Sequence, residues 1–288
     1  NAYDNQENNC QRRKKMSSPS TSSNTTNNSN NGNNNINQKK KFLFGNCKQI
    51  ESRVTEDKIE EFQNFLSTRK TSTVEYLCSQ RGAKEMEKTL KKSPNECITI
   101  LLNNLTATLP KVMTDVYGNY FCQKIIQAST PSQITLMLTY IKKFFVIIAK
   151  DYSGTHVLQA LLEALTSQEQ EIIVLSAISG SELEMAYDYN ATHVLQKIIQ
   201  CIPEERRILL NDIILTNIKQ LALNSNGICL VKKFIGTNVL PQNKIKISNA
   251  LTENCLEIAQ DPYGNYAIQY ILDEWTSSEC KNVVTIII

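Results

Sequence analysis

The sequence predicts an all-α protein, an α-solenoid built from stacked repeats of about 36 residues. A short motif recurs every 36 or 37 residues, and apolar residues at helical spacing accompany each copy. One unit of this length cannot bury its own apolar face, so neighbouring units must cover one another. The clearest copies are DVYGNYFCQKII from Asp115, DYSGTHVLQALL from Asp151, DYNATHVLQKII from Asp188, NSNGICLVKKFI from Asn224 and DPYGNYAIQYIL from Asp261.

Three segments are predicted along the chain. Residues 1–50 are dominated by Asn, Ser, Thr and Lys and predict a disordered basic tail. Residues 51–74 contain a predicted capping helix, from about Thr55 to Thr68, with an apolar stripe of Ile59, Phe62 and Leu66. Residues 75–288 hold a degenerate first repeat, SQRGAKEMEKTL from Ser79, the five copies above and the opening helix of a seventh repeat.

Two helices are predicted in each repeat. The first begins at a Pro or at a Ser/Thr-x-x-Glu/Gln capping box, as at Thr130-Pro131 and at Ser167 with Gln170. The other predicted starts are Ser93-Pro94-Asn95-Glu96, Pro203-Glu204-Glu205, Pro241, and Thr276 with Glu279. The second helix begins inside the motif, where a glycine permits a tight turn and the next residue, such as Asn119, can cap the helix.

Charge is divided unequally along the chain. Residues 1–70 carry a net charge of +5 and residues 71–288 carry −2, so the overall +3 belongs to the tail. The tail could add nonspecific attraction to phosphate or a localisation signal. The repeats themselves are not expected to bind a partner through a strongly basic surface.

Several function classes are not expected. Nine cysteines without a C-x-x-C pair, and only two histidines, indicate free thiols in a reducing compartment and no metal site. We find no catalytic constellation and no glycine loop for phosphate, so neither an enzyme nor a cofactor is predicted. No apolar run reaches about 18 residues and no secretory pattern opens the chain, which favours a cytoplasmic protein without membrane association.

Polar side chains and rings hold a fixed register within the motif. The reading triplets, as we call them, are Asn119, Tyr120 and Gln123; Thr155, His156 and Gln159; Thr192, His193 and Gln196; and Asn265, Tyr266 and Gln269. The first and last members are four residues apart and share a helix face, with the ring on its flank. A single Asn, Gln or His on a helix is usually structural, but four triplets in one register are suited to binding single-stranded bases.

The cores GNYFCQ, THVLQ and GNYAIQ resemble the Pumilio/FBF (PUF) repeats of RNA-binding proteins, over about residues 75–288. The resemblance implies a right-handed crescent whose concave face binds single-stranded RNA antiparallel, one base per repeat. It also implies binding to mRNA 3′ untranslated regions, with translational repression or decay through partner proteins, by a monomer. PUF domains normally have eight repeats, so this chain is expected to be truncated after the sixth.

The family's code assigns U to an Asn/Gln pair and A to a small side chain with Gln. By resemblance, the repeats predict 5′-U-N-A-A-U-N-3′, which is compatible with the downstream part of UGUANAUA-like elements. Two repeats depart from the pattern and receive no base. The fifth has Ile228, Cys229 and Lys232, so its base is expected to be unread or contacted through phosphate, and the first has Ala83, Lys84 and Glu87.

Two alternatives stay open. A PUF-like protein of rRNA processing would keep the fold, but such relatives commonly lose the triplets that are regular here. A helical solenoid of the armadillo or HEAT kind would instead bind protein through its concave face.

Overall fold

The computed structural model describes residues 52–68, 72–237 and 241–287, and this part of the chain consists of helices and connecting turns. The predicted tail, residues 1–50, lies outside the described residues. Residues 52–67 form a helix in which Phe62 is buried, while Ile59 and Leu66 pack against the core of the repeats. The division into tail, capping segment and repeats stays a prediction.

Each repeat contains three helices: a short helix, a motif helix that begins in the repeated motif, and a long helix. The first and second repeats hold α2 (Thr73–Leu77), α3 (Gln80–Leu90) and α4 (Glu96–Leu105), then α5 (Leu109–Thr114), α6 (Gly118–Ala128) and α7 (Pro131–Ile141). The third and fourth hold α8 (Phe145–Lys150), α9 (Gly154–Glu163) and α10 (Gln168–Ile178), then α11 (Glu182–Tyr187), α12 (Ala191–Cys201) and α13 (Ile208–Thr216). The fifth and sixth hold α14 (Ile218–Ala222), α15 (Gly227–Gly236) and α16 (Pro241–Thr252), then α17 (Cys255–Gln260), α18 (Asn265–Glu274) and α19 (Ser277–Ile287).

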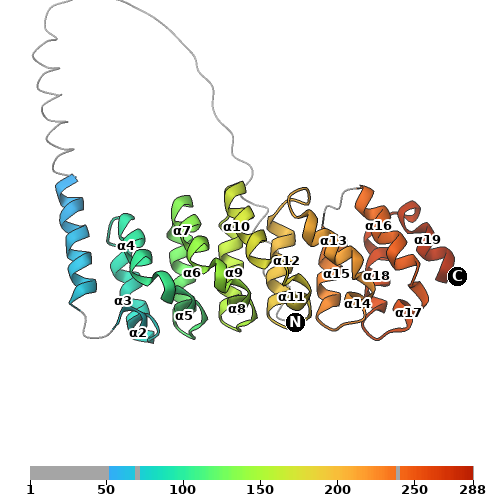
Figure 1. Cartoon of the computed structure of the whole chain (residues 1–288), viewed down its shortest axis with the longest axis horizontal. Helices are drawn as coiled ribbons and strands as arrows, with labels where there is room; N and C mark the ends of the chain where they lie inside the picture. Colours follow the sequence, from blue (N-terminus) through green and yellow to red (C-terminus); the bar gives the residue numbers. More distant parts are fainter. Residues whose placement is uncertain (1–51, 69–71, 238–240, 288) are drawn as a thin grey trace, which may run out of the picture. The chain divides into compact units, whose positions relative to one another are not determined.

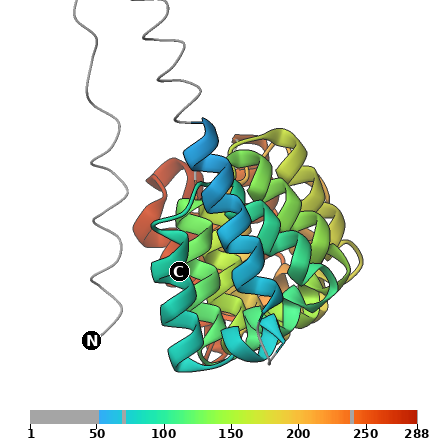
Figure 2. The same ribbon diagram turned by 90° about the vertical axis from the view of Figure 1, so that its left-hand side faces the viewer.

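The repeats stack in a single row from α2 to α19 (Figure 1). Each motif helix contacts the motif helix of the next repeat, in the order α3, α6, α9, α12, α15 and α18. Long helices also meet, as α4 meets α7 and α16 meets α19. The view along the row shows the helices of successive repeats lying behind one another in layers (Figure 2). The predicted stacked-helix fold is confirmed.

The core runs between these layers and uses the apolar positions that the sequence predicts. In the motif helices the buried positions are Phe121, Val157, Val194, Leu230 and Ala267, and, four residues on, Ile125, Leu161, Ile198 and Ile271. In α7 the apolar stripe of Ile134, Met137, Leu138 and Ile141 is buried as well. These apolar positions form one face of each motif helix, and that face must stay buried. The opposite face is therefore the one left for a ligand.

The short helices were not predicted. Between α7 and α8 the chain passes through η4 (Lys142–Phe144), a 3₁₀ turn that redirects it. No Gly or Pro lies between Ser132 and Ser153, so no local signal marks this break. The turn follows from tertiary packing, since α8 lies against α9 and α5.

Residues 131–150 also correct the expectation about membrane spans. By length and composition this 20-residue stretch is apolar enough to cross a bilayer. Its apolar side chains are instead shared between α7 and α8, where Ile141, Phe145 and Ile148 are buried in the core. Buried helices of a repeat array can be as apolar as a membrane span. This explains why residues 131–150 meet a test based on length and composition alone.

The first helix of the fourth repeat starts later than predicted. We expected it at Pro203, but α13 begins at Ile208. The guanidinium of Arg207 is buried; its Nε donates to the carbonyl oxygen of Ile202 at 3.1 Å and its Nη1 donates to Oδ1 of Asn211. These bonds hold residues 203–207 in a compact turn rather than in a helix.

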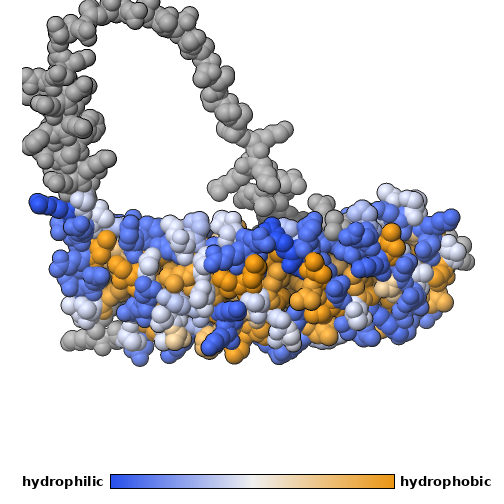
Figure 3. Space-filling view, turned by 45° about the horizontal axis from the view of Figure 1, so that its top comes forward, coloured by the Kyte–Doolittle hydropathy of each residue, from blue (hydrophilic) through white to orange (hydrophobic). Residues whose placement is uncertain are grey.

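The seven cysteines within the described residues form no disulfide bonds with one another. Trp275 follows α18 and is buried at the junction with α19. Apolar side chains nevertheless gather in patches along one face of the array, between hydrophilic margins (Figure 3). Such patches are common because a protein has too little polar surface to cover itself.

Candidate nucleic-acid interface

An Asp or Asn at the start of each motif caps the motif helix that follows. The Oδ1 of Asp151 accepts hydrogen bonds from the backbone N–H groups of Ser153 and Gly154, at 2.9 and 2.8 Å. Equivalent pairs of bonds, each 2.8 to 2.9 Å long, are accepted by Asp115, Asp188, Asn224 and Asp261. These bonds satisfy donors that a helix end leaves without partners. The capping role expected for Asn119 and its equivalents was therefore assigned to the wrong residue.

Gly118, three residues after the cap, lies against the backbone of the preceding short helix. A Cβ on Gly118 would lie 2.3 Å from the carbonyl oxygen of Val112, and a Cβ on Gly154 would lie 2.4 Å from that of Ile148. The described glycine with a positive φ is Gly180, at 83°, outside the motif. At Gly118 and Gly154 the glycine therefore allows close approach of two backbones, rather than a left-handed turn.

In the second repeat the polar pair is held in one arrangement. The Nε2 of Gln123 donates to Oδ1 of Asn119 at 3.2 Å, and the Nδ2 of Asn119 donates to the carbonyl oxygen of Asp115 at 2.8 Å. Asn119 is only 4% exposed, whereas Gln123 is half-buried. A ligand on this face therefore meets the glutamine first.

The sixth repeat repeats this arrangement with its own Asn/Gln pair. The Nε2 of Gln269 donates to Oδ1 of Asn265 at 3.3 Å, and the Nδ2 of Asn265 donates to the carbonyl oxygen of Asp261 at 2.8 Å. The second and sixth repeats thus share both the Asn/Gln pair and its hydrogen bonds. We therefore expect both repeats to recognise the same chemical group.

The two threonine repeats differ, because their hydroxyl groups bridge neighbouring repeats. The Oγ1 of Thr155 donates to the carbonyl oxygen of Asn190 at 3.2 Å, and that of Thr192 donates to the carbonyl oxygen of Asn226 at 3.4 Å. Both threonines are buried. Each contributes to packing as well as to the candidate site.

The glutamines of these two repeats have different partners. The Nε2 of Gln159 donates to Oγ1 of Thr155 at 3.3 Å. The Nε2 of Gln196 is buried and has no hydrogen-bond partner within the described residues. A buried donor without a partner is unfavourable, so this amide is suited to meet an acceptor that a ligand supplies.

The ring of each reading triplet is accessible. Tyr120 is 68% exposed and Tyr266 is 50% exposed, and His156 and His193 are exposed as well. A single exposed ring is common on a protein surface, but here the rings recur at one position of the motif. Each ring offers a flat face on which a nucleic-acid base can stack.

Two further rings were missed in the sequence. The ring of Tyr152 meets that of His156 edge-on, with centroids 6.0 Å apart and planes at 87°, and Tyr189 meets His193 at 6.3 Å and 86°. Each tyrosine lies in the capping turn, four residues before its histidine, so the recurring Tyr-x-x-x-His spacing could have indicated the contact. Tyr152 and Tyr189 are 74% and 67% exposed and widen the aromatic surface of these repeats.

His156 of the third repeat also affects the titration of His193 in the fourth. Partial burial of the imidazole, and secondly the charge of His156, lower the pKa of His193 below its ordinary value. This coupling fits the packing of α9 against α12. The lowered pKa favours the neutral form of His193 near neutral pH.

The motif helices bring the predicted site residues into one row. Because α6 contacts α9 and α9 contacts α12, the triplets of the second, third and fourth repeats lie on consecutive helices of the same layer. The triplet of the sixth repeat, on α18, is separated from them by α15 alone. Four triplets thus face the same side, with one interruption.

The fifth repeat causes this interruption. Ile228 is 5% exposed and has no polar side-chain atom, and Cys229 is exposed but carries no ring. The Nζ of Lys232 lies 6.0 Å from the ring centroid of Tyr266 and 5.3 Å from that of Tyr270. The site of this repeat is therefore cationic where the others present an amide.

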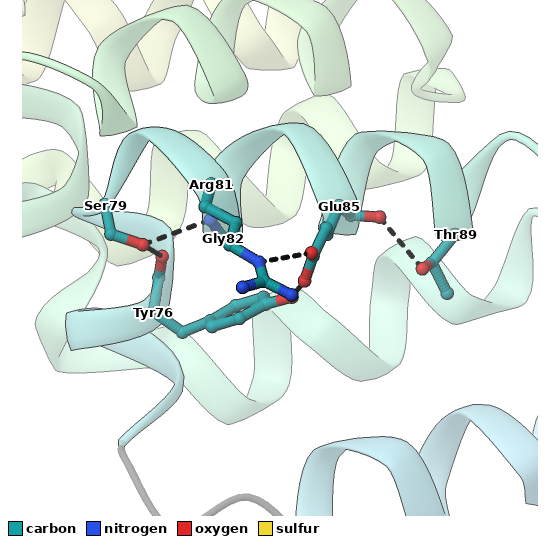
Figure 4. Close-up of polar contacts among 6 residues, drawn as sticks. All are labelled: Tyr76, Ser79, Arg81, Gly82, Glu85 and Thr89. Atoms are coloured by element: carbon teal, nitrogen blue, oxygen red, sulfur yellow. Dashed lines mark hydrogen bonds and ion pairs between the residues drawn. The ribbon is translucent and has the colours of Figure 1, made fainter.

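The first repeat keeps the fold of the motif but not its reading triplet. Ser79 replaces the capping Asp, and its Oγ accepts from the backbone N–H of Gly82 at 3.1 Å (Figure 4). Glu85 in the same helix accepts from Nε of Arg81 at 2.7 Å and from the hydroxyl of Tyr76 (Figure 4). At the triplet positions Ala83 is buried and Glu87 is paired with Lys91 at 2.6 Å.

No group of three or more His, Cys, Asp or Glu side chains that could hold a metal ion is found in the part of the chain that the structure describes. The groups that the reading triplets offer to a ligand are amides, hydroxyls and rings. Their chemistry is hydrogen bonding and stacking.

Comparison with known proteins decides the family. The Pumilio-family RNA binding repeat matches residues 110–141, 144–176, 183–214 and 254–288. The chain is a Pumilio-family (PUF) repeat protein. Each matched stretch covers a short helix, a motif helix and most or all of a long helix, so the family's repeat has the three-helix grouping seen here. Residues 215–253, which hold the fifth repeat, lie between the last two matched stretches.

Curated PUF relatives include two from Arabidopsis thaliana. Pumilio homolog 11 is 28% identical over 199 residues, which is 68% of this chain and 35% of the relative. Pumilio homolog 9 is 26% identical over 236 residues, which is 81% of this chain and 35% of the relative. The chain thus spans about a third of the length of these relatives.

Solved PUF structures share the architecture. The Puf3 RNA binding domain, bound to a Cox17 RNA 3′ UTR recognition sequence, is 26% identical with a TM-score of 0.63, over 74% of this chain and 60% of that one. The Puf4 RNA binding domain, bound to an HO endonuclease RNA 3′ UTR recognition sequence, has a TM-score of 0.67 at 23% identity, over 73% and 66% of the two chains, and shows the fold alone.

Proposed function

We propose that the repeat array binds single-stranded RNA in a sequence-specific way, with each intact reading triplet contacting one base. The observation that carries this proposal is the recurrence of one arrangement on successive motif helices, an exposed ring beside a glutamine amide. Stacking on such a ring contributes about 1 to 3 kcal/mol per base. The likeness to the RNA-bound Puf3 domain supports the same ligand class.

Base reading requires the glutamines to exchange partners. In the second repeat a base would take up the Nε2 of Gln123, which now donates to Asn119, together with its Oε1 acceptor. In the fourth repeat the base would supply the acceptor that Nε2 of Gln196 lacks. Exchange of one hydrogen bond for another costs little, whereas an unmatched base leaves buried polar groups unpaired.

The proposed order of bases follows the family's code. The Asn/Gln pairs of the second and sixth repeats take U, and the Thr/Gln pairs of the third and fourth take A. With antiparallel binding the ligand is 5′-U-N-A-A-U-N-3′, in which N marks the fifth and first repeats. Identical hydrogen bonds in the second and sixth repeats support giving both the same base.

The proposed cellular role is binding to mRNA 3′ untranslated regions in the cytoplasm, as a monomer, with repression or decay of the message through recruited proteins. It is supported by the RNAs named for the Puf3 domain. Because residues 71–288 carry a net charge of −2, the affinity should depend weakly on salt. Most of the binding free energy would then come from stacking and edge contacts.

A fluorescence-anisotropy titration tests the proposal. The chain is titrated against a labelled RNA containing UAAAU and against a scrambled RNA of equal composition, with a Tyr120→Ala, Gln123→Ala variant as control. We expect tight binding to UAAAU that is lost for the scrambled RNA and weakened in the variant. Equal affinity for both RNAs, in a chain with an intact helical spectrum, would contradict base reading and favour a protein ligand for this face.

A further inference from the structure

The fifth repeat holds a charged group where the other repeats hold a reading amide. Lys232 occupies the position of Gln123 and Gln269, the last member of the reading triplet. Its ammonium group lies near two rings of the next motif helix, 6.0 Å from the centroid of Tyr266 and 5.3 Å from that of Tyr270. A lysine side chain that is half-buried against rings is held in place by cation–π attraction.

The surroundings of Lys232 keep it in that position. A Cβ on Gly236 would lie 2.3 Å from the hydroxyl oxygen of Tyr270, so the glycine leaves room for this tyrosine to pack against α15. No ion pair between Lys232 and a carboxylate is present within residues 72–237 and 241–287. The N–H donors of the ammonium group are therefore available to a ligand.

Nothing else at the fifth repeat can select a base. Ile228 is buried and apolar, so it offers no group to a base edge. Cys229 stands at the ring position and cannot stack. On the other side, Lys232 lies over Tyr266, the ring against which a base at this repeat would stack. A base therefore finds neither an edge reader nor a pair of rings.

We propose that Lys232 makes the fifth repeat a base-indifferent spacer, in which its ammonium group binds the RNA phosphate and the base is left unread. The inference rests on the proposed function, since it concerns the same RNA. An ammonium ion has three donors and no acceptor, which matches phosphate oxygens. The separation of the fifth repeat from the stretches matched by the family's repeat agrees with this different role.

The wild-type chain tests the spacer directly. Anisotropy titrations use four labelled RNAs, 5′-UNAAU-3′ with A, C, G or U as the second base, and a scrambled RNA. We expect the four dissociation constants to agree within about two-fold, below the roughly five-fold difference that an edge contact produces. A clear preference for one base, such as G or U, would overturn the inference. Failure of all four RNAs to bind better than the scrambled RNA would overturn the proposed function as well.

Variants of Lys232 test the phosphate contact. Lys232→Gln should weaken all four RNAs equally and reduce the slope of log Kd against log salt by about 0.7. Lys233→Gln, which removes the same charge one residue away, should leave the affinity for the four RNAs and the salt slope nearly unchanged. An unaltered salt slope in Lys232→Gln, with melting temperature maintained, would contradict the phosphate contact.

A variant that should acquire a base preference at the fifth repeat provides the strongest test. The double variant Ile228→Asn, Lys232→Gln installs the pair found in the second and sixth repeats. We expect it to prefer U at the second base by about five-fold or more. A folded double variant that still treats the four bases alike would show that something other than Ile228 and Lys232 prevents reading.

Discussion

Asn119 holds Gln123 in place: its Oδ1 accepts a 3.2 Å hydrogen bond from Nε2 of Gln123, while its own Nδ2 donates to the carbonyl oxygen of Asp115. The buried member of the pair is thus tied to the capping turn, and the accessible member is tied to the buried one. This chain of bonds orients the amide that would face a base. It also means that the two side chains have separable roles.

Truncating each member of the pair should separate stability from binding. Gln123→Ala should weaken binding to UAAAU by about five-fold or more and leave the melting temperature nearly unchanged, because Gln123 donates only to Asn119. Asn119→Ala should weaken binding and also lower the free energy of unfolding by about 1 kcal/mol, because it removes the bond to the Asp115 carbonyl. Calorimetry and anisotropy on both variants check this, and equal melting losses would contradict it.

The capping role of Asp151 can be tested with asparagine, which this chain already uses as the cap of the fifth repeat. Asp151→Ala removes the acceptor of two backbone N–H groups and should lower the free energy of unfolding by about 0.5 to 2 kcal/mol. Asp151→Asn keeps the Oδ1 acceptor, as Asn224 does in the fifth repeat, and should cost much less. Urea denaturation compares the two, and similar losses would show that charge, rather than hydrogen bonding, matters at this cap.

Gly118 should not tolerate a methyl group. Gly118→Ala would place a Cβ 2.3 Å from the carbonyl oxygen of Val112, so the helices must shift, at a cost of about 1 to 3 kcal/mol. The fourth repeat already has a buried Ala191 at this position. Ala191→Gly should therefore cost only about 0.5 to 1 kcal/mol, through backbone entropy. Thermal melting that ranks the two variants in the opposite order would contradict the close-approach argument.

Stability should fall in mild acid because of His193. Its pKa in the folded state is lowered by partial burial and by His156, so the unfolded state binds more protons between that lowered pKa and the ordinary value of 6.5. The contribution is complete above about pH 6.5 and is lost as the pH falls through the lowered pKa. His193→Gln should flatten this pH dependence in urea midpoints measured at about pH 7.5 and 5.5.

His156→Gln provides the control for that pH effect. Removing the neighbouring charge should raise the pKa of His193 toward its ordinary value, although burial would still keep it below. Titration of the His193 ring by NMR checks this. An unshifted pKa would show that the two histidines do not interact.

The fold was predictable because its signal is repeated. The period of the motif, the capping boxes at Thr130 and Ser167, and the buried register of Phe121 and Val157 each agree with the structure. The short helices were not predicted, because the break at Lys142–Phe144 has no Gly or Pro and arises from packing of α8 on its neighbours. Likewise, the turn around Arg207 depends on a buried hydrogen-bond network that no spacing rule indicates.

The candidate site was predicted in position but not in detail. Register alone places Tyr120 and Gln123 on an accessible face, whereas burial of Asn119 and Thr155 depends on the neighbouring repeat. The bond from Thr155 to the carbonyl of Asn190 crosses repeats and could not be predicted from one motif. The rings of Tyr152 and Tyr189 were overlooked because they lie in the capping turn rather than in the helix.

The most direct measurement is a change of base preference at a single repeat. The variant Asn119→Ser, Gln123→Glu is titrated, beside the wild-type chain, against RNAs containing UAAAU and UAAAG. We expect the wild type to prefer UAAAU and the variant to prefer UAAAG, each by about five-fold or more, with both chains equally helical. An unchanged preference for UAAAU in the folded variant would contradict reading of that base by the second repeat.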